Sequence, residues 1–137
     1  MRCVRARSIP ELCSFAMRTR PNRPINDDEV RVIRTALQRC PEIPEAAALV
    51  PTLGDLRVVG GCECGCASVD FAVAKPEQRK PIADGLGMLA DGERVGVIVW
   101  GTSDAVTGLE IYDMSASATG LPLSRLQSII PWEEGAA

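Results

Sequence analysis

Residues 58–73 read Val58-Val59-Gly60-Gly61-Cys62-Glu63-Cys64-Gly65-Cys66-Ala67-Ser68-Val69-Asp70-Phe71-Ala72-Val73. This stretch separates a front half with helical patterns from a back half with strand patterns. In its second part, Val69, Phe71 and Val73 alternate with polar or small residues, among them Ser68 and Asp70. That alternation predicts a half-buried strand over residues 68–74.

Three cysteines occupy every second position of the first part: Cys62, Cys64 and Cys66. In an extended chain their side chains would share one face. They are out of phase with the apolar residues of the following strand. Either the cysteines face away from the core, or the chain slips by one residue; Gly65 suits such a bulge, and Gly60-Gly61 suits a bend before it.

The clearest helix signal lies upstream, over residues 26–40. Asn26 suits the N-cap and Glu29 the third helical position, which together make a capping box. Pro41 ends the pattern. The face predicted to be apolar consists of Val30, Ile33, Leu37 and Cys40.

A second, shorter helix is predicted from Pro44 or Glu45 to Leu49, where Pro51 and Gly54 break the pattern. Downstream, Asp91-Gly92 predicts a hairpin. Strands are predicted over residues 57–59, 68–74, 82–89, 94–100 and 106–114, the third being the weakest and the fourth central. Residues 122–130 predict a terminal helix or turn.

These patterns predict an α+β fold, with N-terminal helices packed on one face of a four- to five-stranded antiparallel meander sheet. We expect residues 1–25 to form a basic, poorly ordered arm, since they hold six arginines and one glutamate. Residues 26–132 are expected to form a single domain, and residues 133–137 a tail.

Composition excludes several functions. The chain of 137 residues contains no histidine, which excludes Ser-His-Asp and Cys-His catalysis and any histidine-ligated metal site. A net charge of −3 argues against nucleic-acid binding. No apolar run reaches the roughly 18 residues that span a membrane, and no leader is evident. We therefore expect a cytoplasmic protein, monomeric or weakly dimeric, with largely reduced cysteines.

The residues also resemble a family of small uncharacterised bacterial proteins. The resemblance rests on the Cys62-x-Cys64-Gly65-Cys66 segment and a later Leu109-Glu110-Ile111-Tyr112 strand, and it covers roughly residues 26–115. It implies one compact unit. It implies no activity and no catalytic residues.

Three kinds of chemistry remain open. Cys62, Cys64 and Cys66 are candidate ligands for a soft metal, Cu(I) or Zn, to which Cys40 or Cys3 could add a further sulfur. The same thiols could be redox-active, although the chain has no Cys-x-x-Cys pair. Asp70, Glu110 and Tyr112 could meet on the open sheet face, as a carboxylate pair for acid–base work or as a face for a ligand or partner.

The first hypothesis is a non-catalytic module that binds an unknown protein or small ligand. The soft-metal or thiol site is the alternative, and a small enzyme that uses carboxylates is third. Structural features distinguish them: an exposed cysteine face favours the metal or thiol site, a pocket at Glu110 and Tyr112 favours an enzyme or a small-ligand binder, and a flat apolar patch favours a protein partner.

Overall fold

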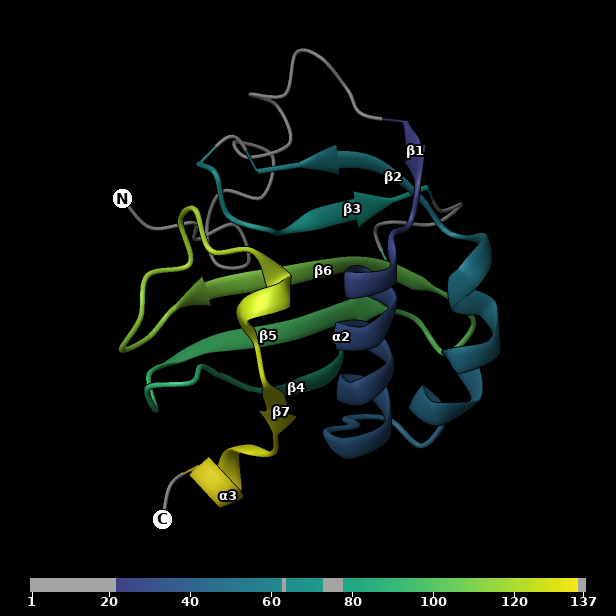
Figure 1. Ribbon diagram of the computed structural model, residues 1–137. Helices are drawn as coiled ribbons and strands as arrows, with labels where there is room; N and C mark the ends of the chain where they lie inside the picture. The colour runs from purple at the N-terminus through teal and green to yellow at the C-terminus, as the bar shows by residue number, and fades with distance from the viewer. Residues whose placement is uncertain (1–21, 63, 73–77, 136–137) are drawn as a thin grey trace.

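The computed structural model describes residues 22–62, 64–72 and 78–135. Seven strands form one antiparallel sheet in the order β1-β2-β3-β6-β5-β4-β7 (Figure 1). The predicted antiparallel sheet with helices is confirmed, but the predicted number of four to five strands was too low. The elements in chain order are β1 Arg23–Pro24, α2 Asp27–Arg39, η1 Ala46–Asp55, β2 Arg57–Gly61, β3 Val69–Phe71, β4 Lys80–Met88, β5 Arg94–Gly101, β6 Val106–Asp113, η3 Leu123–Arg125, β7 Ser128–Ile130 and α3 Trp132–Gly135.

The sheet is not a simple meander. β4, β5 and β6 are joined by consecutive connections, but β3 pairs with β6 through Val69 opposite Leu109. The short edge strands β1 and β7 are the two that sequence analysis missed. β1 lies within the predicted arm, and the last three residues of α3 lie within the predicted tail; residues 1–21 of that arm are outside the described residues.

β4 is the longest strand, although its pattern was the weakest in the sequence. Its glycines explain both observations. A side chain at Gly85 would collide with the Cys40 sulfur, 2.6 Å from the added Cβ, and with the Ile130 carbonyl. The glycine therefore lowers strand propensity while it allows α2 and β7 to approach β4 closely.

Helix α2 begins as predicted. The Asn26 side chain accepts the Glu29 N–H at 2.8 Å, and Glu29 Oε1 accepts the Asn26 N–H at 3.0 Å. Glu29 also receives two hydrogen bonds from Arg23, at 3.0 and 2.7 Å, and these raise the pKa of the Arg23 guanidinium. The capping carboxylate thus ties β1 to the first turn of α2. The buried face of the helix includes Val32, Ile33, Ala36 and Leu37.

The second helical segment, η1, differs from the prediction. It is a 3-10 segment that continues through Pro51 to Asp55 instead of ending at Leu49. Ala46 and Leu49 are both buried and lie three positions apart, which places them on the same side of a 3-10 helix; Leu53 is buried as well. In the same way, residues 128–130 form β7 rather than helix, with Ile129 buried and paired opposite Gly87.

The core lies between the sheet and the layer formed by α2 and η1 (Figure 1). On β5 and β6 the core-facing residues are Val95, Val97, Val99, Leu109 and Ile111, all with 0% exposure. The opposite phase of these strands carries Trp100, Glu110 and Tyr112. Across the described ranges, no helix is long and apolar enough to cross a membrane.

Candidate metal centre

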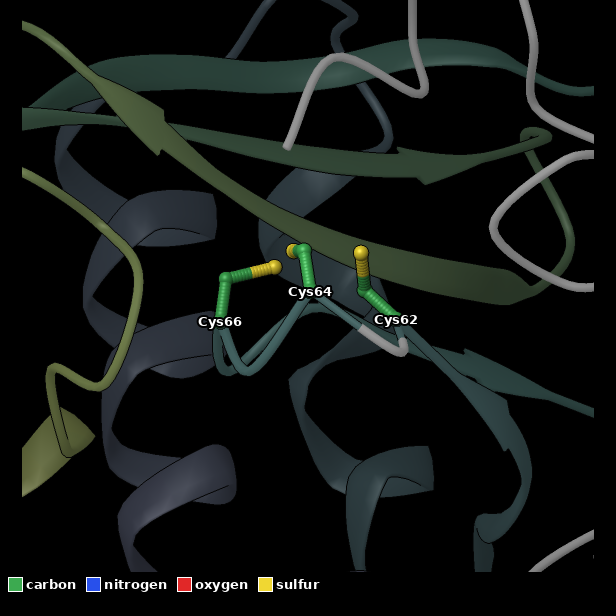
Figure 2. A group of neighbouring side chains, drawn as sticks. All are labelled: Cys62, Cys64 and Cys66. Atoms are coloured by element: carbon green, nitrogen blue, oxygen red, sulfur yellow. The ribbon is translucent and has the colours of Figure 1, made fainter. Parts of the chain in front are cut away.

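The three cysteines of the central stretch come together in the connection between β2 and β3. The sulfur atoms of Cys62, Cys64 and Cys66 all lie within 4.8 Å of one another. Figure 2 shows the Cys64 and Cys66 sulfurs pointing toward one another, with the Cys62 sulfur on the same side of the loop. Cys62 and Cys64 are half-buried and Cys66 is buried. The sequence-predicted trio is therefore one spatial cluster.

A turn, rather than strand alternation, brings the sulfurs together. Gly65 has φ = +93°, in the left-handed region that favours glycine. Its N–H donates to the Cys62 carbonyl at 3.4 Å, and its carbonyl accepts the Gly120 N–H at 2.9 Å. The predicted bulge at Gly65 is thus a chain reversal. The expected irregularity before it is a register shift within β2, between Val58 and Gly60.

Ser68 fixes the end of the turn. Ser68 is 2% exposed, and its Oγ accepts the Cys66 S–H at 3.2 Å and the Ile111 N–H at 2.9 Å. The same hydroxyl donates to the Ile111 carbonyl at 3.3 Å. The Ser68 side chain thereby takes the hydrogen bonds that the backbone of a longer β3 would have made with β6.

A cavity of about 410 Å³ borders the cluster. Cys62, Cys66 and Ser68 line one side of it, and Arg23, Asn26 and Glu29 line the side at the beginning of α2. Two of the three sulfur-bearing residues are therefore reachable from a space large enough to admit a small molecule or a solvated ion.

Cys40 does not belong to this cluster, contrary to the suggestion that it could add a ligand. It follows the last residue of α2, whereas the cluster cavity borders the first turn, and 13 residues of helix span about 20 Å. Cys40 is 5% exposed, and this burial raises the pKa of its thiol to about 11. The other suggested ligand, Cys3, lies outside the described residues.

The residues of the predicted acidic face lie on β3 and β6. Asp70 lies opposite Gly108 on β6, two positions before Glu110. The Arg79 guanidinium is 3.7 Å from Asp70 Oδ1, and Arg79 Cζ lies 5.0 Å from the centre of the Trp100 ring. Trp100 Nε1–H donates to Glu110 Oε1 at 2.9 Å, and Glu110 is 1% exposed.

Tyr112, the third residue of the predicted face, packs against β5. A side chain at Gly96, opposite Tyr112 on β5, would collide with the Tyr112 ring, so the ring covers the glycine. Such packing is a known way to stabilise a glycine within a sheet. Glu110 and Tyr112 therefore both make cross-strand contacts with β5, and their role as a face for a ligand or partner stays a prediction. Sequence analysis missed Arg79 and Trp100 in this network and Ser68 at the cysteine turn, since each acts through a partner distant in the sequence.

Comparisons of the chain with protein-family models, with curated proteins and with solved structures found no match. The resemblance to a bacterial family stays a prediction from the residues quoted above. The function is accordingly argued from the chemistry of the site.

Proposed function

We propose that the protein binds Cu(I) through the thiolates of Cys62, Cys64 and Cys66. The observation that carries the proposal is the mutual separation of at most 4.8 Å between their sulfur atoms. Three sulfurs at about 2.3 Å from a shared ion lie about 4 Å from one another. Small side-chain rotations would therefore suffice to close the site around an ion.

The ligand number favours Cu(I) over Zn. Thiolates are soft ligands that select both ions, but structural zinc sites take four protein ligands. In the described part of the chain, the ligand cluster consists of these three cysteines. Histidine, the other common ligand, does not occur in the sequence. A three-coordinate Cu(I) centre needs no further protein ligand, whereas Zn would need one from outside.

The cavity supports reversible binding. Because it borders Cys62 and Cys66, an external thiol could approach a bound ion and replace one protein sulfur. A zinc or copper site with a purely structural role gains nothing from such access. We therefore assign the site to the uptake and release of the ion.

Accessible cysteines were the feature expected to favour a metal or thiol site. The cavity borders the cysteines rather than Glu110 and Tyr112. Among the residues described, Met114 and Trp132 are the exposed large apolar side chains; Met114 follows β6 and Trp132 begins α3. The module that binds an unknown partner and the carboxylate enzyme stay untested predictions with less support.

Native mass spectrometry of the reduced full chain, titrated with buffered Cu(I), tests the proposal. We expect one Cu(I) per chain, and we expect Cys64→Ser to lose it. Cys40→Ala is the matched control and should bind like the wild type, since Cys40 lies at the other end of α2. A chain carrying Cys3→Ser and Cys13→Ser should also retain the ion.

Two results would count against the proposal. One is a wild-type chain that takes up no Cu(I) under reducing conditions. The other is a Cys64→Ser chain that binds Cu(I) as tightly as the wild type. Loss of two hydrogens without metal uptake would instead favour the thiol-redox alternative at the same cysteines.

A further inference from the structure

The three cysteines of the cluster are held in the fold to different degrees. Cys66 is 8% exposed, and its S–H donates to Ser68 Oγ at 3.2 Å; Ser68 in turn accepts the Ile111 N–H at 2.9 Å. Cys62 is half-buried and directly follows the last residue of β2. Figure 2 shows the sulfurs of Cys64 and Cys66 turned toward one another, with the Cys62 sulfur apart from them. The cluster therefore consists of an inner pair, Cys64 and Cys66, and an outer residue, Cys62.

We propose that Cys62 is the exchangeable ligand of this site, and that the cavity beside it receives a low-molecular-weight thiol with an ammonium group, which replaces the Cys62 sulfur on the ion. This inference rests on the proposed function for the presence of Cu(I). The cavity has a volume of about 410 Å³, which lies in the range of small-molecule sites and suits an aminothiol of this kind.

The cavity determines which sulfurs an entering thiol can reach. Among the described residues that line it, the cluster is represented by Cys62 and Cys66. Cys66 is the less accessible of the two, because it is buried and bound to Ser68. An entering sulfur therefore meets Cys62 first and replaces that ligand.

The inner pair can hold the ion during the exchange. Two sulfurs on opposite sides of an ion, each about 2.3 Å from it, lie about 4.6 Å apart. The sulfurs of Cys64 and Cys66 lie within 4.8 Å of one another, so their separation suits an ion bound between them. The ion therefore stays bound to the chain while Cys62 is replaced.

The exchange is balanced without an oxidant or a reductant. The entering sulfur donates an electron pair to Cu(I), and the bond between Cu(I) and the Cys62 sulfur breaks with its electron pair remaining on that sulfur. The proton of the entering thiol passes to the released Cys62 sulfur. Copper stays in the +1 state, and further exchanges of the same kind at Cys64 and Cys66 complete the release.

The charges around the cavity favour a positively charged thiol. Among the described residues, its charged lining consists of Arg23, Asp28 and Glu29. Arg23 and Glu29 compensate one another through two hydrogen bonds, at 3.0 and 2.7 Å. Asp28 is only weakly compensated, because Arg31 lies 3.8 Å away and water screens a pair whose side chains are 34% and 52% exposed. Three thiolates also outnumber the single charge of Cu(I), so the cavity attracts an ammonium group and repels a carboxylate.

Exchange kinetics test the class of thiol. The full chain, loaded with Cu(I), is mixed with excess cysteamine or with 3-mercaptopropionate, an anionic thiol of similar length, and the loss of copper–thiolate absorbance is followed. We expect Asp28→Asn to lower the ratio of the two rate constants about threefold. The intrinsic reactivity of each thiol cancels, because the same two thiols are compared in both chains.

Glu133→Gln is the matched control for Asp28→Asn. Glu133 lines a second cavity together with Cys40, at the other end of α2, so its loss changes the net charge equally and should leave the ratio unchanged. A ratio that is the same in Asp28→Asn and the wild type overturns the assignment of the thiol class.

Native mass spectrometry tests the exchangeable ligand. Cys62→Ser should still hold one Cu(I) between Cys64 and Cys66, and it should release the ion to a competing chelator sooner than the wild type does. Cys64→Ser should hold none, as the proposed function already requires. A Cys62→Ser chain that loses the ion as fully as Cys64→Ser overturns the assignment of Cys62.

A measurement without metal separates this inference from the proposed function. S-methylcysteamine keeps the ammonium group but has no S–H, and NMR of the metal-free chain follows its binding. The amide signals of Gly60 and Gly61, which line the cavity, should shift in the wild type and much less in Asp28→Asn. A wild-type chain that shows these shifts but binds no Cu(I) refutes the proposed function and the exchange step, while the cavity keeps its aminothiol site. A chain that binds Cu(I) without these shifts refutes the cavity as the docking site.

Discussion

At the residue scale, burial separates Cys40 chemically from the cysteine cluster. The loss of hydration on burial is the largest effect on Cys40 and raises its pKa to about 11, while the neighbouring Arg39 charge opposes the shift. Cys40 is thus a protonated thiol at neutral pH, packed against Gly85 as a small apolar side chain. It should neither bind metal nor react quickly in the folded chain.

The same shift makes stability depend on pH. Between pH 9 and about 11 the folded chain keeps the Cys40 proton and the unfolded chain loses it, so the free energy of unfolding falls as the pH rises. A shift of two units corresponds to about 3 kcal/mol. Urea unfolding at pH 8 and pH 10.5 should show a larger drop for the wild type than for Cys40→Ala. Equal drops for the two chains would mean that Cys40 titrates normally in the fold.

Residue type and spacing were enough to single out Cys62, Cys64 and Cys66 as candidate ligands, because thiols two positions apart are chemically unusual wherever they occur. The hydrogen bonds of Ser68 could not be predicted from the sequence, since its partner Ile111 lies 43 residues away. The alternation pattern even placed Ser68 on the polar phase, whereas it is 2% exposed. A buried polar residue is recognisable only when its partners are known.

At the element scale, the elements that depend on neighbouring residues were predicted correctly, whereas those that depend on pairing with a distant strand were not. The Asn26–Glu29 capping box involves four consecutive residues and fixed the start of α2 correctly. β7 depends instead on its pairing with β4, so its three residues carry no local signature. The apolar spacing of residues 122–130 suits a helix, but the free edge of β4 favours a strand there.

The turn between β2 and β3 offers a matched pair of substitutions. Gly65 and Gly92 have similar positive φ values of 93° and 86°, and an added Cβ meets only ordinary contacts at Gly65 and open space at Gly92. Alanine should therefore cost about 1–2 kcal/mol at either site through backbone strain. Only Gly65→Ala should weaken Cu(I) binding, because only that turn orients the cluster. Chemical unfolding and Cu(I) competition with a chelator measure the two effects; equal Cu(I) affinities for both variants would remove the turn from the site.

At the scale of the whole molecule, the order of the strands in the sheet could not be predicted from the sequence. The hairpins β4–β5 and β5–β6 follow from turns such as Asp91-Gly92, whereas the pairing of β3 with β6 joins residues some 40 positions apart. That pairing brings Ser68 to Ile111 and thus places the cysteine turn on the sheet. The fold class is a property of local patterns, but the position of the site is a property of the topology.

Metal binding should consequently stabilise the entire chain. The turn is attached to distant segments through Ser68–Ile111 and Gly65–Gly120, so the three sulfurs are held together only when the sheet is formed. An ion that binds the folded chain alone adds about 2.7 kcal/mol to the free energy of unfolding at one hundred times its Kd. Thermal unfolding in buffered Cu(I) should show Tm rising with Cu(I) activity in the wild type. In Gly92→Ala the increment should be the same from a lower starting Tm, and in Cys64→Ser it should vanish. An equal increment in Cys64→Ser would mean that the ion stabilises the chain from another place.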